Sequence, residues 1–226
     1  PMVQRQRDVI SGLNTAGFIS GYRGSPVGGY DQQLWNARKF LENNHIKFQP
    51  GLNEDLAASA IWGSQQTNLF EGGKYDGVFG IWYGKGPGVD RCGDVFKHGN
   101  MSGPSKHGGV LLIAGDDHAA KSSTVPHQSE FAFMDASIPV LNPAGVQEIL
   151  DYGVLGFAMS RFSGCWVAFK TTAENMDSSA SIDVAPDRVN IEIPDFDIPD
   201  GGLHIRWPDD WIEQEHRLHN YKLKAV

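Results

Sequence analysis

The sequence predicts a doubly wound α/β fold, in which helices cover both faces of a mostly parallel sheet. Short apolar segments alternate along the chain with segments of helical periodicity, which is the pattern expected when parallel strands are joined by helices. The clearest apolar segment, residues 109–115, is continuous, as strands buried on both faces are. Three successive strands end in polar or glycine-rich stretches, which should meet at one edge of the sheet.

The first elements follow from local patterns. Apolar side chains at helical spacing predict a helix from Gln4 to about Thr15. A strand at residues 17–21 precedes a glycine-rich stretch, residues 22–31, which leads into a helix through Leu41. The glycine spacing matches neither the dinucleotide fingerprint nor the phosphate loop of nucleotide-binding proteins, so it argues against an ordinary nucleotide site.

The next strand and helix contain the residue on which the functional argument depends. Residues 46–48 predict a short buried strand, Pro50–Gly51 a turn, and Asn53 the N-cap of a helix that runs to about Phe70. Glu54 then lies in the first turn of a helix rich in small residues, which allow a backbone or a flat ring to approach closely. The alternative is structural, because the helix dipole favours acids in any first turn.

The remaining elements complete the alternation. Further strands are predicted at residues 77–83, 109–115, 138–141 and 166–169. A glycine-rich loop at residues 84–88 leads into a helix through residues 89–96, and another helix runs from Gln147 to about Arg161.

The last part of the chain has a different composition. From about Glu174 it is rich in Pro, Asp, Ser and Gly, and only residues 189–193 alternate like a strand. We therefore expect one domain over residues 1–184, followed at residues 185–226 by a loop-rich linker and the start of a following domain.

Composition narrows the classes of function. The 226 residues have a formal net charge of −8, which argues against nucleic acid or an anionic membrane as the main partner. Cys92 and Cys165 are the only cysteines, too few for a disulfide framework or a four-thiolate iron–sulfur cluster. No apolar run approaches the roughly 18 residues of a membrane span. We expect a cytoplasmic protein that acts on a small molecule.

Other chemistries have weaker support in the sequence. Four side chains suit zinc or iron but have no recognised ligand spacing: Asp116, Asp117, His118 and His127. Ser25 and Cys92 are candidate nucleophiles without an identifiable partner base. Residues 115–117, upstream of Asn142, partly match the motif that holds magnesium and diphosphate in thiamine enzymes, but Asp117 stands where that motif has glycine. The sequence therefore predicts no metal site.

Four segments, taken together and in order, carry a resemblance to a known family. They are residues 21–26, Asn53–Glu54, Lys85–Gly88, and residues 114–118 with Ser122–Ser123 and Gln128–Glu130. Over roughly residues 3–184 the chain resembles the pyrimidine-binding domain of the 2-oxoacid:ferredoxin oxidoreductases, which bind thiamine diphosphate. Within that superfamily it most resembles the large fused bacterial indolepyruvate ferredoxin oxidoreductases.

The resemblance implies roles for particular residues. Glu54 would be the catalytic glutamate that hydrogen-bonds N1′ of the thiamine aminopyrimidine, and Lys85 and Gly86 would also contact the cofactor. The loop Arg23-Gly24-Ser25-Pro26 would bind the substrate. The Mg²⁺ ion that accompanies thiamine diphosphate would be held by a domain outside this chain, and [4Fe-4S] clusters would lie elsewhere in the full protein.

The resemblance also implies a reaction and partners. Aryl 2-oxo acids such as indolepyruvate would be oxidatively decarboxylated to acyl-coenzyme A, with ferredoxin as the electron acceptor. Other domains of the same enzyme would contact this one, in a homo-oligomer. Two alternatives stay open: another thiamine-dependent 2-oxo acid decarboxylase or oxidoreductase, and a non-catalytic α/β assembly module in which Glu54 is an ordinary first-turn acid.

Overall fold

The apolar strands form a single six-stranded sheet in the computed structural model, which describes residues 1–226. The strand order is β2-β1-β3-β4-β6-β5, and every neighbouring pair is parallel. The strands are β1 (Ala16–Gly21), β2 (Ile46–Phe48), β3 (Val78–Lys85), β4 (Val110–Asp116), β5 (Val140–Leu141) and β6 (Val167–Thr172). The predicted parallel α/β fold is confirmed.

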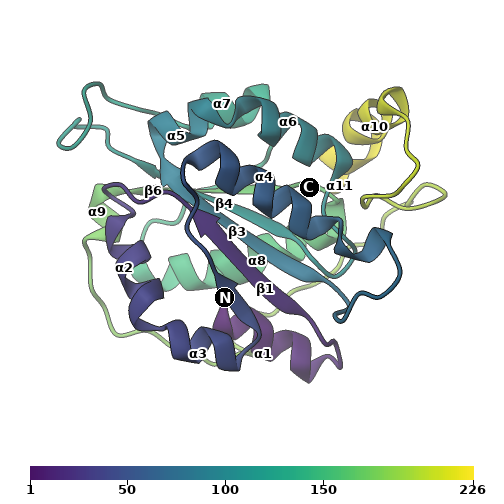
Figure 1. Ribbon diagram of the computed structural model, residues 1–226, viewed down its shortest axis with the longest axis horizontal. Coiled ribbons are helices and arrows are strands. Elements are labelled where there is room, and N and C mark those ends of the chain that lie inside the picture. The colour runs from purple at the N-terminus through teal and green to yellow at the C-terminus, as the bar shows by residue number, and fades with distance from the viewer.

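Helices cover both faces of this sheet (Figure 1). The helices of the chain are α1 (Met2–Ile10), α2 (Gly28–Asn36), α3 (Arg38–Asn43), α4 (Glu54–Gln65), α5 (Gly86–Arg91), α6 (Gly93–Ser102), α7 (Glu130–Asp135), α8 (Val146–Ser163), α9 (Ala173–Met176), α10 (Trp211–Arg217) and α11 (Leu223–Ala225). No helix is both long enough and apolar enough to cross a membrane.

Alternation along the strands divides the core into two layers. Trp82 on β3 is buried with Phe96 and Trp166 beneath α4, α5, α6 and α7. Its neighbour Tyr83 points to the other face, where it packs in the cluster under α2, α3 and α8 that contains Phe157. Because both faces are covered, the strands are apolar on both sides, as the continuous segment 109–115 had indicated.

Several element boundaries differ from the sequence-based expectation. Helix α1 ends at Ile10 rather than near Thr15, because Gly12 adopts a left-handed φ of 78°. Helix α4 ends at Gln65, not near Phe70, and a short 3₁₀ turn at Thr67–Leu69 follows it. The predicted loop at residues 84–88 was wrong: β3 continues to Lys85 and α5 begins at Gly86.

The C-terminal segment packs against the end of α6 rather than extending the sheet. Residues 189–193 form no strand, and the Arg7 side chain donates to the carbonyl oxygen of Val189. The Lys222 ammonium donates to the carbonyl oxygen of Met101 at 2.8 Å, and Figure 1 shows α10 beside α6. The division of the chain at residue 184 stays a prediction.

Candidate functional site

Glu54 is held at the first position of α4, directly after the turn that leaves β2. The Asn53 side chain accepts the Leu56 N–H at 2.8 Å, which caps the helix as its sequence predicted. The indole N–H of buried Trp82 donates to the carbonyl oxygen of Glu54 at 3.0 Å. The backbone of Glu54 is therefore attached both to its own helix and to the centre of the sheet.

The Glu54 side chain is 13% exposed and lies close to Gly84 and Gly88. A Cβ at Gly84 would be 3.5 Å from its Cγ, and one at Gly88 would be closer still. Neither carboxylate oxygen has a hydrogen bond within the chain, and the only ionic partner, the exposed Arg91, lies 3.9 Å from Oε2. Glu54 is thus a partly shielded carboxylate that is free to bind a ligand nitrogen.

Cys92, between α5 and α6, is fully buried. Burial raises the pKa of Cys92 well above its usual range, and the negative charges of Asp55 and Glu54 raise it further. A neutral buried thiol is a poor nucleophile, so the geometry speaks against Cys92 in that role.

The Arg23–Pro26 loop leaves β1 at the same edge of the sheet. Arg23 and Ser25 are exposed, whereas Pro26 is buried near Gly115 of β4. A Cβ at Gly24 would lie 2.5 Å from Cδ of Lys85, so a larger residue there would have to displace that side chain. The loop and Lys85 therefore lie in contact, as the predicted convergence of strand ends requires.

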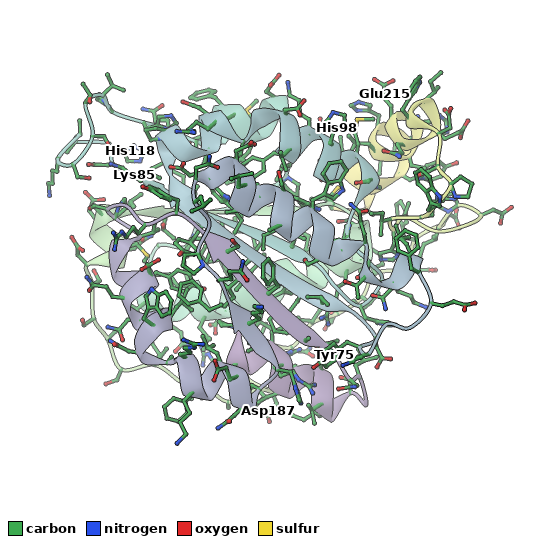
Figure 2. The ribbon with its side chains drawn as sticks, viewed as in Figure 1. Tyr75, Lys85, His98, His118, Asp187 and Glu215 are labelled. Carbon is green, nitrogen blue, oxygen red and sulfur yellow. The ribbon has the colours of Figure 1, made fainter.

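Lys85 and Gly86 join β3 to α5. The Lys85 ammonium donates to the carbonyl oxygen of Ser122 at 2.9 Å, which attaches it to the long loop after β4. Figure 2 shows the labelled side chains of Lys85 and His118 on the same side of the molecule, where the loop after β4 projects. The His127 ring packs directly on Gly86: a Cβ at this position would lie 2.2 Å from the ring, so a larger residue would collide with it.

Buried charges form a network beneath that loop which the sequence did not reveal. Asp116, at the end of β4, is fully buried and accepts the N–H of Ser129 at 2.8 Å together with its hydroxyl. The Lys170 ammonium lies 3.8 Å from Asp116 and contacts both oxygens of Glu130 at 2.8 Å. His127 extends the network, with Nε2 2.8 Å from Asp90.

The four side chains that suit a metal, Asp116, Asp117, His118 and His127, make contacts within the chain instead. Asp117 accepts the Ser122 N–H at 2.8 Å, and this hydrogen bond lowers the pKa of Asp117 below its usual value. Nδ1 of His118 lies 3.1 Å from the carbonyl oxygen of His127. No three His, Cys, Asp or Glu side chains are grouped so as to hold a metal ion.

The structure thus brings most of the predicted site residues to one place. Glu54, Lys85, Gly86 and the Arg23–Pro26 loop all lie where β1, β2 and β3 end. Lys170 and Asp90 were missed. The one sequence signal for Lys170 is its position directly after the apolar run 166–169. Nothing in the local sequence distinguishes Asp90 from an ordinary solvated acid on a helix.

Comparison with known proteins gives little further guidance. No protein-family model matches the chain. The chain is 30% identical over 82 residues to the large ribosomal subunit protein uL3 of Phytoplasma mali (strain AT). That similarity covers 36% of this chain and 35% of uL3, so the chain spans about a third of the length of the curated relative that it matches.

Proposed function

We propose that the chain is the pyrimidine-binding domain of a thiamine diphosphate-dependent 2-oxoacid:ferredoxin oxidoreductase that acts on indolepyruvate or related aryl 2-oxo acids. The observation that supports this most is the carboxylate of Glu54, which lies at the strand ends, mostly shielded and without a hydrogen-bond partner. A carboxyl group in that setting suits the ring nitrogen N1′ of an aminopyrimidine.

Two glycines lie against the side chain of Glu54. A Cβ at Gly84 would lie 3.5 Å from its Cγ and one at Gly88 would lie 2.5 Å from it, so glycine at both positions leaves the carboxylate where it is. Bound thiamine diphosphate supplies the electron sink for decarboxylation of a 2-oxo acid. Glu54 would bind N1′ and hold a proton there, and Lys85 and Gly86 would line the same space. The exposed Arg23 would attract the substrate carboxylate.

The rest of the proposed enzyme lies outside this chain. The diphosphate and its Mg²⁺ would be bound by another domain, and the [4Fe-4S] clusters need more thiolates than two cysteines provide. Coenzyme A and ferredoxin would then act as partners of the whole enzyme. The proposed compartment is the cytoplasm, and the proposed assembly is a homo-oligomer.

The alternatives differ in what they require of Glu54. An assembly module would leave it on a solvated helix end, and its 13% exposure favours the enzyme instead. A thiamine-dependent decarboxylase that uses no coenzyme A would share the same site. We infer no ribosomal role from the partial similarity to uL3, because a net charge of −8 opposes binding to RNA phosphates.

Replacement of Glu54 tests the proposal in the full-length protein. The Glu54→Gln change keeps the shape of the side chain but removes the acid, so proton exchange at the thiazolium C2 of bound cofactor should slow. Turnover should fall by about 10²–10⁴-fold, the size of a general acid–base contribution. Asp55→Asn is the matched control and should cost far less. If Glu54→Gln exchanges that proton as fast as wild type, Glu54 is an ordinary first-turn acid and the proposal fails.

A further inference from the structure

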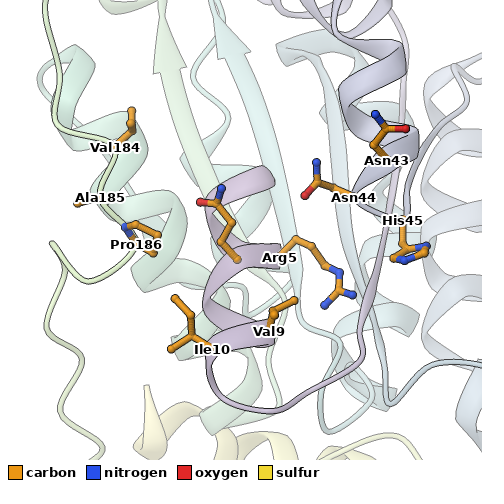
Figure 3. Close-up of a pocket in the computed structure, with 10 residues that line it drawn as sticks. Arg5, Val9, Ile10, Asn43, Asn44, His45, Val184, Ala185 and Pro186 are labelled. Carbon is orange, nitrogen blue, oxygen red and sulfur yellow. The ribbon is translucent and has the colours of Figure 1, made fainter.

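A pocket lies at the edge of the sheet where the strands begin, opposite the edge that holds Glu54. Its volume is about 720 Å³. It lies between α1, the turn that joins α3 to β2, and the segment Val184–Pro186 (Figure 3). It is lined by Arg5, Gln6, Val9, Ile10, Asn43, Asn44, His45, Val184, Ala185 and Pro186. This pocket is separate from the candidate site, because it includes His45, directly before β2, whereas Glu54 comes after the other end of that strand.

Arg5 is a buried cation without an anionic partner. It is 7% exposed, and its guanidinium reaches only neutral acceptors, the carbonyl oxygen of Leu13 at 3.3 Å and Oδ1 of Asn14 at 3.4 Å. Arg217, the one other arginine buried to this degree, pairs with Asp209. Of the five N–H donors of a guanidinium, three are therefore left unused on Arg5.

The carboxylates on neighbouring elements are engaged elsewhere. Asp8, one turn further along α1, is bound by Arg161. Glu42 forms its ion pair within α3, and Asp76 accepts the N–H of Asn14 at 2.7 Å. No acidic side chain lines the pocket. A shielded guanidinium with free donors is stabilised strongly by a carboxylate, so the missing partner points to a ligand.

The remaining lining indicates what kind of anion fits. The amides of Gln6 and Asn43 make no hydrogen bond within the chain and are available to a polar group. Val9 and Ile10 expose 55% and 74% of their surface beside Arg5. Figure 3 shows Arg5 extending between these apolar side chains and His45.

We propose that this pocket binds a small organic carboxylate. Its carboxylate would pair with the guanidinium of Arg5, and its apolar part would contact Val9 and Ile10. One planar guanidinium matches one carboxylate in a bidentate pair, whereas inorganic phosphate would leave the apolar side chains uncovered. This proposal is independent of the function proposed for Glu54.

Titration with hexanoate tests the pocket directly. The Arg5 Nε–H resonance of the 226-residue chain should shift saturably in a nitrogen–proton correlation spectrum as hexanoate is added. Hexanol, which has no charge, and inorganic phosphate, which has no apolar part, should bind at least about tenfold more weakly. A saturable shift with phosphate at the same affinity would overturn the organic class of the ligand. No saturable shift with hexanoate would overturn the site.

A substitution on the pocket wall supplies the missing carboxylate from within the chain. Val9 is exposed and lies one helical turn after Arg5, so Val9→Glu adds an internal partner without removing core volume. Hexanoate should then bind about tenfold more weakly or worse. Val9→Gln, of the same shape, loses only the apolar contact at this position, so it should bind hexanoate at least about threefold more tightly than Val9→Glu. Equal affinities for the two variants would contradict the role of Arg5. Arg38→Gln, on α3 outside the lining, should bind as wild type.

Discussion

The side chain of Glu54 occupies the space that the absent Cβ of Gly88 leaves open. A Cβ on Gly88 would lie 2.5 Å from Cγ of Glu54 and 3.0 Å from its Oε1. The first distance is far shorter than the normal contact of two carbon atoms. Any residue other than glycine at position 88 of α5 must therefore displace the side chain of Glu54 at the start of α4. The position of the candidate carboxylate therefore depends on a glycine in a different helix.

Gly88→Ala should consequently disturb the proposed activity more than the fold. We expect the free energy of unfolding to fall by about 1–3 kcal/mol, because one methyl group is forced into a packed space. Turnover of the full-length protein should fall by about 10²-fold, the cost of a displacement of about 1 Å in a catalytic group. Steady-state kinetics and urea unfolding measure the two effects.

The matched control is Gly153→Ala on α8, on the other side of the sheet. A Cβ there meets nothing within 4 Å, so the change should stabilise the helix by about 1 kcal/mol and leave turnover unaltered. If Gly88→Ala behaves like this control, the contact between Gly88 and Glu54 has no bearing on activity.

Asp8→Ala should destabilise the chain because Asp8 joins α1 to α8. Its two oxygens accept from the guanidinium of Arg161 at 2.6 and 2.9 Å, and Asp8 is 3% exposed. Removal leaves a shielded guanidinium without its charge partner, so the free energy of unfolding should fall by about 3 kcal/mol in urea titrations. Glu42→Ala, which breaks an exposed pair within α3, should cost less than about 0.5 kcal/mol. Similar losses for both changes would contradict this account.

Local sequence was sufficient for the elements that depend on local interactions. Asn53 could be predicted as an N-cap because its side chain bonds to a backbone N–H three residues later, and the apolar strands could be predicted because both faces of the sheet are covered. The glycines at residues 84–88 predict a loop, because glycine is common in turns, but this prediction was wrong. In the structure they allow close approach of Trp82, His127 and Glu54.

The charge network could not be predicted from local patterns. Lys170 meets Asp116 only because β6 pairs with β4 in a register that places Lys170 opposite Ala114. His127 reaches Gly86 only because the loop after β4 folds back over α5. Contacts of this kind depend on strand order and loop path, which a single sequence does not specify. The roles assigned to Glu54 and the Arg23–Pro26 loop stay predictions.

Both cysteines should be unreactive in the folded chain. Cys92 and Cys165 are fully buried, and burial raises the pKa of the Cys165 thiol to about 11. With an aromatic disulfide reagent at pH 8, the two thiols should react only as fast as the chain unfolds, and both should react at once in concentrated guanidinium. Rapid reaction of Cys92 in the folded chain would restore it as a candidate nucleophile.

Lys222 should give the stability of the chain a positive slope with pH in the alkaline range. The side chain is fully buried, and this burial lowers the pKa of its ammonium group from 10.5 to about 8. Between those values the folded state binds fewer protons than the unfolded state, so the contribution of this group to stability rises with pH. Below about pH 8 the whole penalty is present, on the order of 3 kcal/mol.

Lys222→Met isolates this contribution, because it removes the titrating group while the neighbouring thiol of Cys165, whose raised pKa gives the opposite slope above pH 9, is kept. The free energy of unfolding, measured in urea from pH 7.5 to 10.5, should rise more steeply with pH in wild type than in the variant, by up to one proton in the slope. Lys224→Met, two residues further on and exposed, should follow the wild-type slope. Parallel curves for wild type and Lys222→Met would mean that the ammonium keeps its charge in the folded chain across this range, held by the carbonyl oxygens of Asn100 and Met101 at the end of α6.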